Sequence, residues 1–145
     1  MVKHVYLVRL HTTHCRFIAY YRSGGFGTEA LKYAIDSIEC LKIICSTKHT
    51  LCLMGDFNLP GINLLQHSHP NGEIYTLFMN FFNDLGLHQF VQQPTRGSNI
   101  LDLLFSNDPG LLARIDILCP IDTSDHNLIT FEINDSILTF DEKKQ

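Results

Sequence analysis

Three short polar clusters in this 145-residue chain contain the residue types that hydrolytic chemistry needs. They are Gly-Asp-Phe-Asn at 55–58, Ser-Asn-Ile-Leu-Asp at 98–102 and Ser-Asp-His-Asn at 124–127, and each adjoins a predicted strand. Loops that extend from a rigid sheet commonly build functional sites. Carboxylates can act as bases or hold a divalent cation, and an imidazole can exchange a proton near neutral pH. The clusters therefore predict acid–base or metal-assisted chemistry.

Each cluster also has an ordinary structural explanation. Asp and Asn directly after a strand are common turn residues, so Asp56 and Asn58 alone do not establish a site. Asp102 lies between two leucines within a predicted strand, where it faces either solvent or a polar partner, and the sequence leaves both possibilities open. The spaced histidine pairs at 11 and 14 and at 67 and 69 lack a third ligand, so we interpret them as loop residues.

The elements that must position these residues alternate between strands and helices. Short runs rich in β-branched, aromatic and apolar residues predict strands at 4–10, 16–21, 51–54, 88–92, 100–106, 113–118 and 128–133. Apolar residues at helical spacing predict a helix that begins with Thr28 as its N-cap and ends near residue 46. The same spacing predicts a second helix over residues 74–85, which Gly86 ends. This mixture predicts one layered domain of the α/β or α+β class.

Composition and charge limit the function classes. Hydrophobic residues make up 45% of the chain, enough for one core, and no apolar run approaches the ~20 residues that span a bilayer. The N-terminus makes a poor signal peptide, so we expect an intracellular protein without a membrane partner. Five cysteines without a CxxC pair indicate reduced, mostly buried thiols. A net charge of −4 counts against a simple nucleic-acid binder but is compatible with a magnesium site.

Taken in order, the motifs resemble those of the endonuclease/exonuclease/phosphatase superfamily. The matching segments are Tyr-Arg-Ser at 21–23, Gly-Asp-Phe-Asn-Leu-Pro at 55–60, Gln-Pro-Thr-Arg-Gly at 93–97, Leu-Asp-Leu-Leu at 101–104 and Ser-Asp-His at 124–126. The Pro-Thr-Arg and Leu-Asp-Leu forms are similar to those in endonuclease domains of jockey-like non-LTR retrotransposons. The resemblance implies a partial two-sheet sandwich with flanking helices at 1–133, lacking its N-terminal strands, and a polar C-terminal tail at 134–145.

The resemblance implies a metal-dependent phosphodiester hydrolase that nicks DNA. Asp56 corresponds to the aspartate that orients or deprotonates the attacking water, and Asn58 to the asparagine that holds this water and the phosphate. Asp102 and His126 resemble the family's pair in which the carboxylate orients the imidazole and stabilises its protonated form. The implied partners are DNA and a downstream reverse transcriptase domain of the parent polyprotein. A functional parent protein would act in the nucleus.

Two further residues complete the implied site. Asp125 would lie against the metal, which is Mg²⁺ or alternatively Mn²⁺, and Tyr21 would offer its phenol to a phosphate or leaving oxygen. The family's principal metal-binding glutamate comes from a strand that precedes the part of the domain matched here. Glu29 and Glu73 open predicted helices, where they serve the helix dipole and do not replace that ligand. We therefore expect this chain alone to bind Mg²⁺ weakly and to be inactive.

Two alternative functions remain open. The chain could be a non-catalytic truncated remnant or a binding module, which would keep the fold signals without activity. It could also be another phosphoesterase of the superfamily that acts on phosphorylated lipid or sugar, although the Pro-Thr-Arg segment argues against this. The nuclease hypothesis requires the carboxylates and amide at 56, 58, 102 and 125 to converge with His126 on one cleft. It also requires Asp102 and His126 to lie within hydrogen-bond reach.

Overall fold

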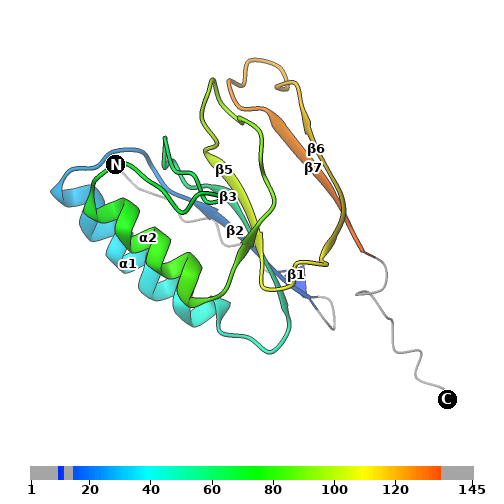
Figure 1. Cartoon of the computed structure of the whole chain (residues 1–145), viewed down its shortest axis with the longest axis horizontal. Helices are drawn as coiled ribbons and strands as arrows, with labels where there is room; N and C mark the ends of the chain where they lie inside the picture. The colour runs from blue at the N-terminus through cyan, green and yellow to red at the C-terminus, as the bar shows by residue number, and fades with distance from the viewer. Residues whose placement is uncertain (1–9, 12–14, 135–145) are drawn as a thin grey trace.

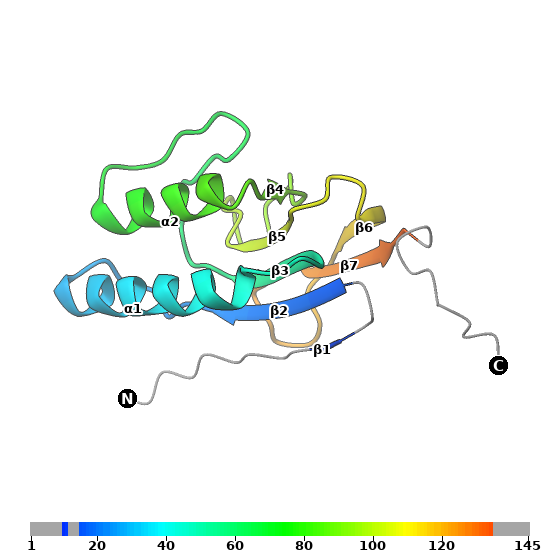
Figure 2. The same ribbon diagram turned by 90° about the horizontal axis from the view of Figure 1, so that it is seen from below.

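The computed structural model describes residues 10–11 and 15–134 and contains three layers. Two helices lie on one side of a five-stranded sheet, and a two-stranded sheet lies on its other side (Figures 1 and 2). The fold is therefore mixed α/β and fits a partial two-sheet sandwich with flanking helices, as predicted. Neither helix in the described part of the chain has the length and apolar composition that a membrane crossing requires.

The five-stranded sheet forms the centre of the domain. Its strands, in spatial order, are β1 (Leu10–His11), β2 (Cys15–Tyr21), β3 (Thr50–Asp56), β5 (Asp102–Ser106) and β4 (His88–Gln89). β2 and β3 are parallel, whereas the other neighbouring pairs are antiparallel. The apolar run at 51–53 is fully buried in β3, because β3 is central and both of its faces are covered.

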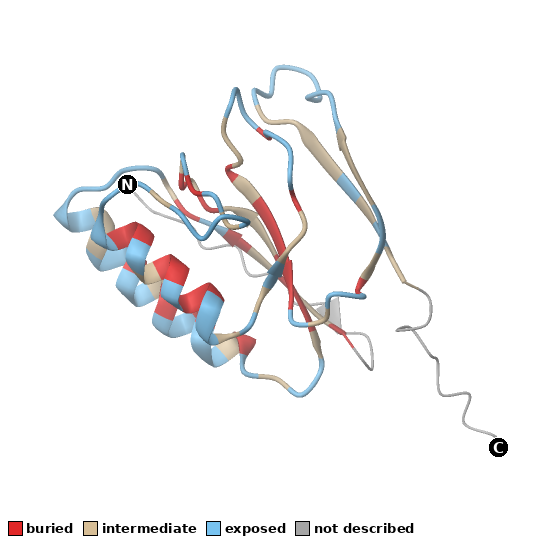
Figure 3. Ribbon diagram, viewed as in Figure 1, coloured by how far each residue is buried: buried red, intermediate tan, exposed pale blue. Residues whose placement is uncertain are grey.

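Two helices cover one face of this sheet. α1 (Thr28–Cys45) makes the crossover that parallel β2 and β3 require, and α2 (Glu73–Asp84) lies beside it (Figure 1). Both helices turn their buried sides toward the sheet (Figure 3). The core between helices and sheet is rich in aromatic residues, with Phe57 packed edge-on against Phe78, Phe82 and Phe105.

The second sheet packs on the opposite face of the first. It consists of β6 (Leu112–Leu118) and β7 (Leu128–Ile133), which pair antiparallel. A second apolar cluster fills the space between the sheets; it includes Cys52 and Leu104 from the first sheet and Ile117, Ile129 and Phe131 from the second. This packing fixes the segment that precedes β7 next to the ends of β3 and β5.

Gly55 allows β2 and β3 to approach closely just before Asp56. Its φ is +142°, and a Cβ added there would collide with the backbone carbonyl of Tyr20. Only glycine adopts this conformation without strain, so the residue type at 55 helps to set where Asp56 lies relative to β2.

The structure differs from the sequence-based expectations in several details. Gly27 is the N-cap of α1, without a side-chain capping bond, so the prediction of Thr28 as N-cap was wrong by one residue. The strand expected at 88–92 covers only His88–Gln89, and the one expected at 100–106 begins at Asp102. All five cysteines are free thiols, but Cys40 and Cys119 are exposed. Residues 4–9 of the first expected strand and residues 135–145 of the expected tail lie outside the described residues.

Candidate functional site

Three predicted site residues form one row across the main sheet. The register pairs Tyr21 of β2 with Asp56 of β3, and Asp56 with Asp102 of β5. Side chains alternate between the two faces of a strand. Tyr20 and Leu103 are buried on the helical face, so the side chains of the row point to the opposite face, toward the second sheet. The row lies at the end of the sheet where β2 and β3 finish and β5 starts.

His126 joins this row from the other sheet. It lies in the turn at 124–127 before β7, where its backbone N–H donates to Ser124 Oγ at 3.1 Å. Its Nδ1 lies 2.7 Å from Asp102 Oδ2, so the expected hydrogen bond is present and Asp102 faces a polar partner. Its Nε2 lies 4.0 Å from Asp56 Oδ2 and 3.9 Å from Asp125 Oδ1. The structure therefore brings the predicted carboxylates and imidazole together.

Asn58 holds the Asp56 carboxylate through both of its nitrogen atoms. The Asn58 backbone N–H donates to Asp56 Oδ1 at 2.9 Å, and its side-chain Nδ2 donates to Asp56 Oδ2 at 3.1 Å. Asn58 adopts a φ of 49°, a left-handed conformation that asparagine tolerates better than most residues. In this structure the Asn58 amide thus orients Asp56, and its expected contact with water and phosphate stays a prediction.

The surroundings of Asp56 change its acidity. Burial and the neighbouring Asp102 carboxylate raise the pKa of Asp56 above its ordinary value. The Asn58 N–H, His126 and Arg96 act in the opposite direction without cancelling the rise. A carboxylate with a raised pKa is a stronger base than an ordinary aspartate, which suits a group that accepts a proton.

Arg22 is a buried cation beneath this part of the site. Only 6% of its surface is exposed, and its guanidinium donates to the backbone carbonyls of Phe57 at 2.7 Å, Gly25 at 2.9 Å and Asn58. Its own carbonyl accepts from Asn58 Nδ2 at 2.8 Å, and its N–H donates to the Asp56 carbonyl at 2.8 Å. The guanidinium therefore fixes the backbone that carries Asp56 and Asn58.

The rim of the site is more exposed. Asp125 forms an ion pair with Arg96, with 2.5 Å between Oδ2 and Nη2, and 64% of the Asp125 side chain is exposed. Tyr21 is 44% exposed at one end of the row. Sequence reasoning assigned no role to Arg22, Thr95 or Arg96. All three lie inside the quoted motifs, but nothing in the sequence shows that their side chains reach other segments.

The site contains a group that could hold a metal ion. Asp56, Asp102 and His126 each offer one ligand atom, and these atoms lie within 4.8 Å of one another. Mg²⁺ prefers oxygen ligands and retains several waters, which two carboxylates satisfy in part. A set that includes imidazole nitrogen also suits Mn²⁺. The residues present therefore fit a hydrated divalent cation.

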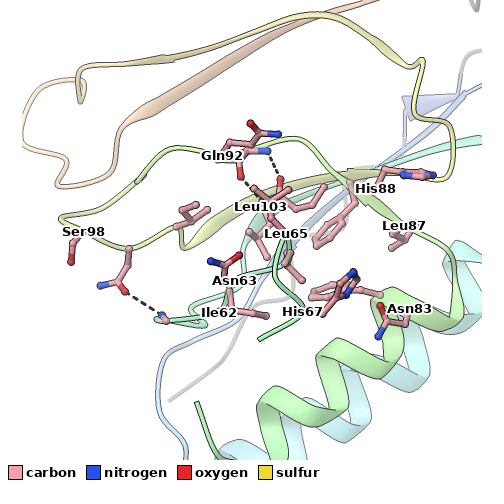
Figure 4. Close-up of a pocket in the computed structure, with 18 residues that line it drawn as sticks. Ile62, Asn63, Leu65, His67, Asn83, Leu87, His88, Gln92, Ser98 and Leu103 are labelled. Atoms are coloured by element: carbon pink, nitrogen blue, oxygen red, sulfur yellow. Dashed lines mark hydrogen bonds between the residues drawn. The ribbon is translucent and has the colours of Figure 1, made fainter. Parts of the chain in front are cut away.

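A cavity of about 590 Å³ lies elsewhere in the domain. It is bounded by the loop at 61–67, the end of α2 and β4, with His67, Asn83 and His88 among its lining residues (Figure 4). The cluster of Asp56, Asp102 and His126 contributes nothing to its lining. The candidate site therefore lies at the strand ends, outside this cavity.

Comparisons with known proteins agree with the fold. No curated protein matches the chain significantly. The endonuclease domain of TRAS1, a telomere-specific non-LTR retrotransposon, has a similar fold, with a TM-score of 0.67 and 20% sequence identity. The similarity covers 93% of this chain and 63% of that structure, so the chain spans less than two thirds of its length. The profile of the endonuclease-reverse transcriptase family matches residues 15–130. Because this match covers most of the chain, the protein belongs to the endonuclease-reverse transcriptase family.

Proposed function

We propose that this domain is a metal-dependent phosphodiester hydrolase that nicks DNA. The observation that carries the proposal is the convergence of Asp56, Asp102 and His126, which come from two sheets and share one small space. Groups that meet in this way suit general acid–base chemistry on a single substrate.

The imidazole is arranged to act at its free nitrogen. Asp102 accepts the hydrogen bond of His126 at Nδ1, which orients the ring and places the proton of the neutral tautomer on Nδ1. Nε2 then faces Asp56 and Asp125 at distances too long for a direct hydrogen bond. When both ring nitrogens carry a proton, Nε2 would donate to a phosphate oxygen placed there and stabilise it as its negative charge develops.

Asp56 is the best candidate for the general base. Its oxygen lies 4.0 Å from His126 Nε2, so both groups can contact neighbouring atoms of the same reacting phosphate and water. Its raised pKa makes it a better proton acceptor, and the two Asn58 donors keep the carboxylate in one orientation. Proton transfer by a positioned side chain contributes about 10²- to 10⁴-fold to a rate.

A divalent cation held at this site would neutralise charge on the phosphate. Asp56 and Asp102 would hold Mg²⁺ or Mn²⁺, with Asp125 at the exposed side of the same space. Arg96 provides a cation beside Asp125 and opposes the rise in the pKa of Asp56, so its charge reaches this space and would attract a phosphate. Tyr21, at the end of the row, offers a phenol on the same face.

The proposed substrate and partners follow from the family. Its name joins an endonuclease to a reverse transcriptase, so we propose DNA as substrate, a reverse transcriptase domain in the parent polyprotein and action in the nucleus. The similarity to the TRAS1 domain supports the same assignment over a phosphoesterase that acts on lipid or sugar. A non-catalytic remnant remains the competing hypothesis, which activity measurements decide.

Nicking of supercoiled plasmid tests the proposal. A form of the domain extended upstream by the family's preceding strands should convert supercoiled to open-circular DNA with Mg²⁺ or Mn²⁺ and not with EDTA, and Asp56→Asn and His126→Gln in that form should each lose about 100-fold or more. The 145-residue chain alone should nick no faster than these variants. Asp84→Asn and His88→Gln change the same residue types outside the site and should keep wild-type rates. No nicking by the extended form, or equal rates for its site and control variants, would favour the remnant.

A further inference from the structure

The contact between Asp102 and His126 joins two different sheets. Asp102 is the first residue of β5 in the main sheet, whereas His126 lies in the turn before β7 in the second sheet. Their side chains are 2.7 Å apart, and a hydrogen bond at that distance requires both backbones to be held in register. Backbone contacts also hold the two segments together, in addition to the side-chain hydrogen bond.

Thr95 binds the backbone on the Asp102 side. Its side chain is fully buried, and its Oγ1 accepts hydrogen bonds from the backbone N–H groups of Leu101 and Asp102, both at 3.0 Å. These N–H groups lie where β5 begins, before the ladder with β3 takes over. The hydroxyl thus satisfies two donors that would otherwise be buried without a partner, and it fixes the start of the strand.

The same residue binds the backbone on the His126 side. The Thr95 carbonyl accepts from the Asn127 N–H at 2.7 Å, and the carbonyl of Pro94 accepts from Asn127 Nδ2 at 3.1 Å. Asn127 directly follows His126, so these bonds set the position of the imidazole. The Thr95 N–H donates to the Asn99 carbonyl at 2.8 Å, which closes the intervening turn and makes the bridge stiff.

We propose that Thr95 is a positioning residue that sets the Asp102–His126 pair by binding the backbone of both partners. The effect of Thr95 on catalysis rests on the proposed function. Its effect on the position of Asp102 and His126 is independent of that function. Threonine suits the position because its branched side chain has few rotamers and its hydroxyl accepts two bonds. Valine has the same shape but cannot accept either bond, and serine keeps the hydroxyl.

The test measures the tautomer of His126 by ¹⁵N NMR of its imidazole in metal-free chain at constant pH. Wild type and Thr95→Ser should show one tautomer with the proton on Nδ1, and Thr95→Val should show an average over both tautomers. Asn127→Ala removes the side-chain hydrogen bond to the Pro94 carbonyl and keeps the backbone bond to Thr95. It should increase the population of the second tautomer less than Thr95→Val does. Ile38→Ala, which destabilises the core on the helical side, should leave the tautomer unchanged.

The outcomes separate positioning from general stability. A single Nδ1–H tautomer in folded Thr95→Val, or an equal change in Ile38→Ala, would overturn the proposal. If Thr95→Val does not fold, Asn127→Ala decides, and a wild-type spectrum would then overturn it. In the nicking assay of the extended form, Thr95→Val should lower kcat by about 10- to 100-fold with little change in KM, whereas Thr95→Ser should keep it near wild type. If the extended form is inactive, the nuclease assignment fails and the NMR result alone decides the role of Thr95.

Discussion

Replacing Arg22 should reveal how strongly the fold depends on a buried cation under the site. Arg22→Met keeps most of the side-chain volume but removes three donors, which leaves the carbonyls of Gly25, Phe57 and Asn58 without these partners. Arg22→Lys keeps the charge, but its single ammonium group cannot reach the three carbonyls that the planar guanidinium binds with separate nitrogens. We expect both variants to be destabilised and both to loosen Asn58.

The magnitude follows from opposing terms. A hydrogen bond to a charged group contributes about 1.5–3 kcal/mol, and Arg22 donates three. Burial of the charge costs desolvation free energy, as the lowered pKa of Arg22 shows. Removing the guanidinium removes this cost, which offsets part of the lost stability. Disruption of comparable buried charged contacts costs about 3–5 kcal/mol, so we expect about 3 kcal/mol for Arg22→Met. In a domain of this size that corresponds to a Tm lower by roughly 6–12 °C.

Urea and thermal denaturation of the purified variants measure this loss. Arg114→Met is a matched control, because Arg114 pairs with Asp116 at the surface and 63% of its side chain is exposed. Its denaturation midpoint should be indistinguishable from wild type. If Arg22→Met unfolds at the same midpoint as Arg114→Met, the guanidinium does not hold the site backbone and the reasoning fails.

Three further predictions concern the site and its support. With EDTA present, the raised pKa of Asp56 means that its protonated form favours folding; this contribution to stability is present below the unfolded pKa and is lost as pH rises through the raised folded pKa. Asp56→Asn should therefore reduce the dependence of the denaturation midpoint on pH over this range, and an unchanged dependence would contradict the prediction. Mn²⁺ should broaden the NMR signals of Asp56 and His126 first, and broadening centred elsewhere would place the cation at another site. Gly55→Ala should cost at least about 3 kcal/mol in urea denaturation, whereas Gly86→Ala, with φ +59° and open space, should cost about 1–2 kcal/mol; equal losses would refute the close approach at Gly55.

The sequence predicted the helices and buried strands well because their signals are local. The apolar spacing that predicts α2 is the spacing of its buried residues, and the continuous run at 51–53 is fully buried in β3. These local signals failed to predict burial where it depends on contacts between distant segments. Ile35 lies among the apolar residues that recur at helical spacing in α1 but is 45% exposed, whereas Ala34, Ile38, Leu41 and Cys45 form the buried side of the helix.

The site shows the same division. The sequence alone identified the carboxylates and the imidazole, because their residue types and order form recognisable motifs. It left open whether Asp102 faces solvent or a partner, since a strand position does not reveal what the opposite sheet presents. Only the packing of β6 and β7 on the main sheet brings His126 to Asp102, and only the folded backbone shows what Arg22 and Thr95 bind. Those contacts join segments far apart in the chain, and their geometry depends on the whole domain being folded.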